Sequence, residues 1–227
     1  MKFLLIILAT LACASLSAEQ LDSTQKYIMT ENCRNHDKDS CQKLIDNGLP
    51  SVAECGKDES CSWIGAIYHL AGHSDKAAQY WAKSCDSQSL GVREVARGCY
   101  NLGAYYARNK QFDKSFALHQ KVCDNFEDSP SSISACNSVA SFYKRGDGTK
   151  QDFALAVKYY QKAIDLSEDF ELDDPRPFYN LAELQESGKG TPKNLTQAKE
   201  NYKKACKPYR DFKDSCQKYE SFEKQSK

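Results

Sequence analysis

The sequence predicts an all-α protein built from repeated pairs of helices. Four short segments resemble one another: CSWIGAIY at 61–68, CYNLGAYY at 99–106, CNSVASFY at 136–143 and FYNLAELQ at 178–185. They begin 38, 37 and 42 residues apart, a period that is typical of helix-pair solenoids. A second shared segment follows each one, at 76–85, 114–123, 154–164 and 197–206, and apolar and small residues recur at helical spacing in both segments.

The composition is that of a folded chain with no dominant charge. Of its 227 residues, 41% are apolar and 27% are charged, which excludes a disordered or collagenous protein. The 31 basic residues balance 31 acidic ones, so no global positive field exists to attract nucleic acid. We therefore expect no nucleic-acid partner.

The first eighteen residues have the pattern of a secretory signal peptide. Lys2 precedes an apolar run at 3–11, and a stretch of small residues follows at 12–18. This run is too short to cross a bilayer as a helix, and no later segment is as apolar, so we expect no membrane span. Lipid attachment at Cys13 is an alternative, although residues 10–12 match a lipoprotein signal poorly. Either way, we expect bacterial export and a periplasmic or secreted location.

The turns between the paired segments point to a family. KRGDGTKQD at 144–152 and SGKGTPKN at 187–194 supply glycines suited to a helix exit at positive φ. Together with ALAVKYYQKA at 154–163, this pattern resembles the Sel1-like repeat, a relative of the tetratricopeptide repeat. The resemblance covers about residues 60–206 and implies a right-handed α/α solenoid, although the first two pairs have shorter turns. The cysteine placement is similar to that of cysteine-rich Sel1 proteins exported by bacteria.

The repeat register predicts how the cysteines pair. Removing the signal peptide leaves ten of the 11 cysteines, an even number that favours a disulfide framework. In three of the four aligned repeats a cysteine ends the second helix, and its predicted partner lies at the start of the next first helix. The third pair lacks both, with Ile164 and Phe178 in their places, as expected if the two positions are normally bonded. The predicted disulfides are Cys85–Cys99, Cys123–Cys136, Cys206–Cys216, Cys33–Cys41 and Cys55–Cys61.

The predicted organisation is one elongated domain with capped ends. We expect a signal peptide at 1–18, capping helices at 19–60, four repeats at 61–98, 99–135, 136–177 and 178–206, and a capping helix at 207–227. Within the first cap we expect a helix at 21–32, and a helix at 41–48 whose return is residues 51–55. The acidic stretch at 168–174 reads as a surface loop.

The chain lacks the motifs of the common enzyme classes. HLAGH at 69–73 has the histidine spacing of a helical metal site but not its glutamate, so we predict no metal and no cofactor. Ser-x-x-Lys occurs at Ser23, Ser40, Ser141, Ser215 and Ser221, but no Lys-Thr-Gly or Ser-Asp-Asn accompanies it. We therefore expect no catalysis. Because some cysteine-rich Sel1 proteins are described as β-lactamases, a β-lactam-hydrolysing or cell-wall-peptide-binding protein is the alternative.

Binding is the better functional hypothesis, because a solenoid creates a concave surface along its first helices. On a tetratricopeptide-like frame this surface carries Ser62, Tyr100, Asn137 and Tyr179, with Arg97, Arg108, Lys144 and Arg145 nearby. The alternative for these residues is an ordinary solvated surface. We predict a monomeric scaffold for a protein or peptide partner with an acidic or carboxylate-bearing segment. Several exported Sel1 proteins resemble inhibitors of secreted effectors, so an immunity role is one form of this function.

Overall fold

The computed structural model describes residues 21–56, 60–172, 174–206 and 213–225, and these residues form eleven helices and no strand. The predicted signal peptide lies outside the described residues. No described helix is both long and apolar enough to span a bilayer. The helices are α1 Ser23–Arg34, α2 Lys38–Asp46, α3 Cys61–Ala71, α4 Ser74–Cys85, α5 Val92–Arg108, α6 Phe112–Asn125, α7 Ser131–Arg145, α8 Phe153–Asp169, α9 Pro175–Ser187, α10 Leu195–Cys206 and α11 Lys213–Gln225.

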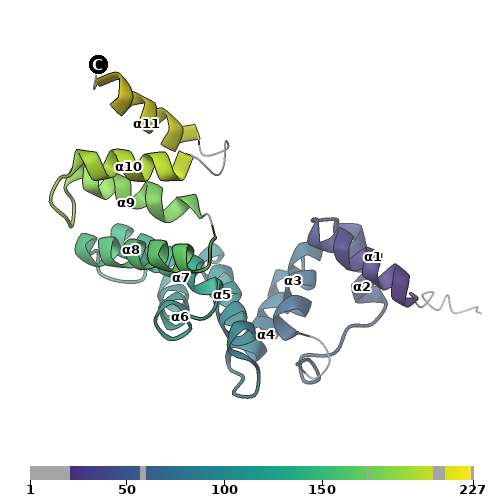
Figure 1. Ribbon diagram of the computed structural model, residues 1–227. Helices are drawn as coiled ribbons and strands as arrows, with labels where there is room; N and C mark the ends of the chain where they lie inside the picture. The colour runs from purple at the N-terminus through teal and green to yellow at the C-terminus, as the bar shows by residue number, and fades with distance from the viewer. Residues whose placement is uncertain (1–20, 57–59, 173, 207–212, 226–227) are drawn as a thin grey trace, which may run out of the picture.

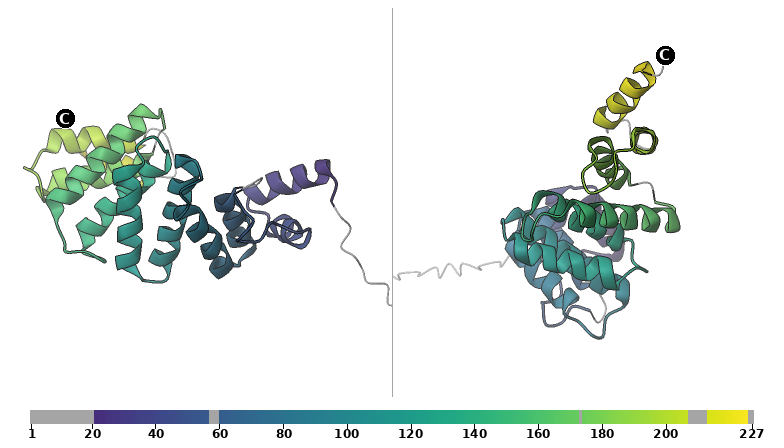
Figure 2. Two further views of the ribbon diagram at one scale, coloured as in Figure 1. Left: turned by 90° about the horizontal axis from the view of Figure 1, so that it is seen from below. Right: turned by 90° about the vertical axis from the view of Figure 1, so that its left-hand side faces the viewer.

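The helices form a solenoid of pairs, which confirms the predicted fold class. The pairs are α3 with α4, α5 with α6, α7 with α8, and α9 with α10, and every helix from α3 to α11 packs on the one before it. Figure 1 shows them following one another along a curved path, with α1 and α11 at opposite ends, and the left view of Figure 2, seen from below, shows the same elongated order. The first helices α3, α5 and α7 also contact one another directly, which places them on the inner side of the curve.

Each pair is locked by a ring on the second helix that covers a small residue on the first. A Cβ atom added to Gly103 would lie 2.4 Å from the His119 ring, so no larger residue fits there. Gly65 has the same relation to Trp81, at 2.5 Å. The four small residues are Gly65, Gly103, Ala140 and Ala182, and the rings at the matching positions are Trp81, His119, Tyr160 and Tyr202. All eight are buried, so this contact runs through the whole repeat array.

The glycines of the long turns have two different roles. Gly146 ends α7 in the left-handed region, with φ of 79°, as a helix exit requires. Gly148 also has positive φ, but a Cβ atom there would lie 2.3 Å from the backbone carbonyl of Phe112, at the start of the preceding second helix. Gly190 meets the backbone of Phe153 in the same way, at 2.2 Å. The second glycine of each turn therefore allows one repeat to pack against the previous one.

The structure contains the five predicted disulfides, which close loops of 6 to 14 residues. Ile164 and Phe178 are both buried in one apolar cluster at the junction where the sixth bridge is missing. Apolar packing therefore replaces the covalent link there. Cys99 and Cys136 lie well inside α5 and α7 rather than at their starts, so a repeat boundary drawn at these residues cuts through a helix.

Equivalent lysines join successive second helices. They lie two positions before the final cysteine, or its replacement, in each second helix. Lys121 Nζ donates to the Cys85 carbonyl at 3.3 Å, and Lys204 pairs with Glu168 at 3.2 Å. Lys162 pairs with Asp124 of α6 at 3.7 Å and with Glu127, just after α6, at 2.8 Å. These contacts link the outer side of the solenoid from α4 to α10.

Two expectations about connections were wrong. Residues 51–55, expected to pair with the helix before them, form a turn. The Ser51 carbonyl accepts from the backbone N–H groups of Glu54 and Cys55, and the described residues that follow do not continue this into a helix. The acidic stretch is only partly a loop, since Glu168 and Asp169 belong to α8. The link that remains before α9 is therefore short.

Candidate functional site

The inner surface of the solenoid carries a line of polar residues at equivalent positions of three first helices. Arg97 of α5, Ser134 of α7 and Arg176 of α9 occupy the same place in the repeat. Arg176 Nη2 donates to Ser134 Oγ at 2.9 Å, so the side chain reaches back across one repeat. Arg97 is exposed, and no described carboxylate forms an ion pair with it.

Arg176 is held at this surface by a carboxylate on one side and a phenol on the other. Asp174 caps α9 and accepts from the guanidinium, at 2.6 Å from Nη2 and 2.9 Å from Nε. The hydrogen bond with Asp174 raises the pKa of Arg176, and the nearby Tyr100 adds a smaller increase. Arg176 therefore connects α7 and α9 beside Tyr100 of α5, and about half of its side chain stays exposed.

Tyr100 rests on a buried histidine. Its ring stacks on His119 with centroids 5.2 Å apart, and His119 also makes a T-shaped contact with Phe142. His119 is 3% exposed and its Nδ1 is buried without a hydrogen-bond partner. Burial lowers the pKa of His119 to about 4, so the ring is neutral near pH 7. The stack leaves Tyr100 half-buried. Its ring therefore contributes to packing, and the part that stays exposed remains open to a partner.

A second polar group lies at the α7–α9 boundary. Lys144 Nζ pairs with Glu183 at 2.6 Å and donates to Asn180 Oδ1 at 3.3 Å. Tyr179 packs edge-on against Tyr202, and burial followed by the charge of Glu183 raises the pKa of Tyr179. Lys144 and Tyr179 are thus brought together, but the lysine charge is already balanced by a carboxylate.

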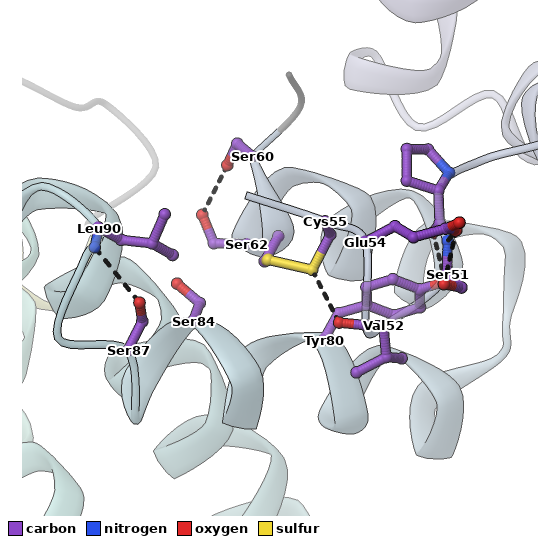
Figure 3. The surroundings of a disulfide bond; sticks show 12 residues. Ser51, Val52, Glu54, Cys55, Ser60, Ser62, Tyr80, Ser84, Ser87 and Leu90 are labelled. Carbon is purple, nitrogen blue, oxygen red and sulfur yellow. Dashed lines mark hydrogen bonds between the residues drawn. A yellow bond between two sulfur atoms is a disulfide. The ribbon is translucent and has the colours of Figure 1, made fainter. Parts of the chain in front are cut away.

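Two of the predicted concave residues are not on the exposed surface. Ser62 is fully buried because its backbone N–H and its hydroxyl both donate to the carboxylate of Glu94, each at 2.7 Å. Ser60 and Ser84 donate to the same carboxylate, and Figure 3 shows these three serines near the Cys55–Cys61 disulfide.

Burial raises the pKa of Glu94, but the hydrogen bonds from Ser60 and Ser62 outweigh it and hold the pKa below its ordinary value. Glu94 therefore fastens the start of α3 to α5. Asn137 is 8% exposed, so it too lies beneath the surface.

The remaining predicted residues lie at the far ends of the first helices. Arg108 Nη1 is 3.1 Å from His69 Nε2, and burial followed by the Arg108 charge lowers the pKa of His69. Arg145 pairs with Asp147 at 2.6 Å. His73 contacts Gln42 at 3.1 Å rather than His69. Among the described residues, no group of three acidic, histidine or cysteine side chains could hold a metal ion.

One Ser-x-x-Lys pair lies on the inner surface, but its members have separate partners. The Ser141 hydroxyl is 3.0 Å from the Tyr160 hydroxyl, and Lys144 is bound to Glu183 and Asn180. The lysine and the serine therefore point to different partners and form no hydrogen bond with each other among the described contacts.

Sequence reasoning missed Arg176, Ser134 and His119. The first two were detectable, because they share the repeat position of Arg97, which was identified. His119 was detectable by its place among the rings that cover small residues, where the other three are Trp81, Tyr160 and Tyr202.

Comparisons with known proteins support the repeat assignment. The model of the Sel1 repeat matches residues 96–124, 133–168 and 179–207, which leaves the pair α3–α4 outside the matches. Cysteine rich protein B (hcpB) of Helicobacter pylori is 31% identical over 63% of this chain and 91% of its own, with a TM-score of 0.43. BtubC (BKLC) from P. vanneervenii is 14% identical over 83% of this chain and 72% of its own, with a TM-score of 0.50. At this identity the likeness indicates a similar fold only. No curated protein matches.

Proposed function

Because the chain belongs to the Sel1-repeat family, whose members typically serve as scaffolds for protein interactions, we propose that it is a non-catalytic scaffold binding a protein or peptide partner on its inner surface. One observation carries the proposal: Arg176 of α9 donates to Ser134 of α7 and lies close to Tyr100 of α5, so polar side chains line three successive first helices. An extended partner segment that follows this line would contact three repeats at once.

The charges on this surface favour an acidic segment of the partner. Arg97 is exposed and forms no ion pair with a described carboxylate, and its charge acts on Glu94 only as the last of the contributions that lower the pKa of that residue. Arg176 is already balanced by Asp174 but is about half exposed, and arginine binds a carboxylate through two parallel hydrogen bonds. Tyrosine and arginine are also the side chains that most often dominate interface energies. Neutralisation of a secreted effector by an immunity protein is one function that such a surface would support.

The compartment follows from the cysteines. Five disulfides indicate a chain that resides in an oxidising, extracytoplasmic place. Export by a signal peptide at residues 1–18, followed by caps and four repeats, is part of the proposal. The partner is therefore expected among secreted or periplasmic proteins.

The test is a binding measurement with matched variants. A partner recovered from the extracytoplasmic fraction would be titrated calorimetrically against the wild type, Arg97→Ala, Tyr100→Phe and Lys158→Ala. We expect Arg97→Ala to weaken binding by roughly 1 to 3 kcal/mol, the range of an interface anchor. Tyr100→Phe removes only the hydroxyl near Arg176, so it is the variant that preserves the stack on His119.

Lys158 is exposed on α8, a second helix, and its loss should leave binding unchanged. Equal losses for Arg97→Ala and Lys158→Ala would contradict the proposal. Hydrolysis of nitrocefin by the purified oxidised protein would instead favour a β-lactam-hydrolysing function.

A further inference from the structure

A cavity of about 270 Å³ lies between α1, α2 and α3, away from the polar line described above. Its apolar walls come from Leu44 and Leu49, and from Trp63 and Ile67 one helical turn apart on α3. Lys26 and Thr30 of α1, also one turn apart, contribute its polar side. Asn47 at the end of α2 and Ser60 at the start of α3 also line it. The cavity therefore combines an apolar wall from α2 and α3 with a mixed polar rim, in which Lys26 of α1 carries the charge.

The repeat register places this cavity at the N-terminal end of the inner surface. Trp63 occupies the position of Asn101, Ser138 and Asn180 in the later first helices. The first pair therefore has a large ring where the others have a small polar side chain. The guanidinium carbon of Arg34 lies 4.9 Å from the centre of the Trp63 ring, and Arg34 is itself paired with Glu31.

The size of the cavity restricts what can fill it. Pockets that enclose a drug-sized molecule or cofactor usually measure roughly 300 to 1,000 Å³, and this cavity, at about 270 Å³, lies at the lower end of that range. A large aliphatic side chain fits within this volume and would bury its surface against the apolar wall. Tyr27 and Ile28 do not line the cavity, but they are exposed on the same helix, at 67% and 47%. Exposed apolar side chains on an element that lines a cavity favour a protein or peptide guest.

The charge of the lining indicates what accompanies the apolar group. Lys26 is the charged member of the lining, and no carboxylate belongs to its described residues. Lys26 forms no ion pair with a described carboxylate either, in contrast to Arg34. An acidic group next to the guest side chain would supply that partner.

We propose that the α1–α2–α3 cavity is an anchor site for a peptide segment in which a large aliphatic residue is followed by an acidic one. The aliphatic side chain enters the cavity beside Trp63, and the carboxylate pairs with Lys26 at its edge. This site acts independently of the partner proposed for the Tyr100 line, although both face the same inner surface.

The chain contains its own reporter for this test. It has 2 tryptophans, of which Trp63 lines the cavity and Trp81 is 3% exposed in the core. Tryptophan emission would be followed while the purified oxidised protein is titrated with acetylated, amidated tetrapeptides of sequence Ala-Leu-Glu-Ala, Ala-Leu-Gln-Ala and Ala-Ala-Glu-Ala. We expect the leucine peptide to bind at least tenfold more tightly than its alanine analogue, and the glutamate peptide a few-fold more tightly than the glutamine one at low salt.

Variants separate the two contacts. Lys26→Gln should remove the preference for glutamate and keep the preference for leucine, whereas Lys43→Gln, an exposed lysine of α2 outside the lining, should change neither. Thr30→Phe should fill the cavity and abolish binding, with an unchanged circular dichroism spectrum. Trp63→Phe should remove the emission change, and Tyr100→Phe should leave peptide binding intact.

Three results would overturn the proposal. They are no emission change with any peptide, equal affinity for the leucine and alanine peptides, and full binding by Thr30→Phe. A dimer in sedimentation that Thr30→Phe dissociates would also overturn it, by making a second copy of the chain the occupant. If the peptides fail while Arg97→Ala still weakens partner binding, this inference fails and the concave-face proposal stands.

Discussion

Replacing His119 by phenylalanine should remove most of the pH dependence of stability between pH 7.5 and 5. His119 is buried with its Nδ1 unpartnered, and burial lowers its pKa to about 4. The matching rings in the other repeats are Trp81, Tyr160 and Tyr202, so the position accepts an aromatic ring. Phenylalanine keeps the ring over Gly103 and has no group that titrates.

The sign and size follow from the shift. In an unfolded chain the histidine takes up a proton near pH 6.5, whereas the folded state resists protonation until about pH 4. Between these values the unfolded state binds more protons, so stability falls as the pH falls. For this single group the loss between pH 7.5 and 5 is about 2 kcal/mol. The pKa of His69 is also lowered, so the wild type should lose somewhat more than this amount.

The assay is urea unfolding, followed by circular dichroism, of wild type and His119→Phe at both pH values. The difference between the two proteins isolates His119 from His69. At pH 7.5 the variant should equal or exceed the wild type, because it no longer buries an unpartnered nitrogen. His36→Asn, at an exposed residue with positive φ, is the control that should keep the wild-type dependence. A His119→Phe protein as sensitive to pH as the wild type would refute a buried neutral histidine.

Two further predictions concern the junctions between repeats. Gly148→Ala should lower the free energy of unfolding by roughly 2 to 4 kcal/mol, because it adds left-handed strain and a clash with the Phe112 backbone. Gly146→Ala in the same turn should cost about 1 to 2 kcal/mol, because only the strain applies. Equal melting temperatures for the two variants would disprove the inter-repeat contact. Ile164→Cys combined with Phe178→Cys should form a sixth disulfide, because both side chains are buried in one cluster at the position of the missing bridge. Mass spectrometry after alkylation should find no free thiol in the double variant and one in Ile164→Cys alone, and two alkylated cysteines in the double variant would show that the register is wrong.

The fold was predictable because its determinants repeat. The cysteine pairs and the turn glycines recur at the repeat period, so each copy tests the alignment of the others. The absence of a bridge at Ile164 and Phe178 was itself informative, since a bonded pair is lost as a pair. Helix starts were less predictable. The helix α5 begins at Val92, seven residues before Cys99, so the disulfide with Cys85 attaches within the helix and does not mark its start.

The site was only partly predictable because it depends on contacts between repeats. Arg176 contacts Ser134, which lies 42 residues earlier in the chain, and no local sequence pattern predicts a contact over that separation. Ser62 and Asn137 occupy the repeat position of Tyr100, but they are smaller and lie beneath the surface. For Ser62 the reason is Glu94, whose carboxylate takes both of its donors. Position within a repeat thus predicts the face of a helix, whereas exposure depends on the neighbouring repeat.

Site-specific photo-crosslinking tests partner binding on the inner surface most directly. A benzophenone side chain would replace Ser138 on α7, at the inner surface, or Lys158 on the outer helix α8. Irradiation of cells that export each variant should give one discrete protein adduct from position 138 and none from position 158, and adding Arg97→Ala should reduce the adduct severalfold. Adducts of equal yield from both positions, or an adduct at 138 that Arg97→Ala leaves unchanged, would contradict a partner bound along this surface.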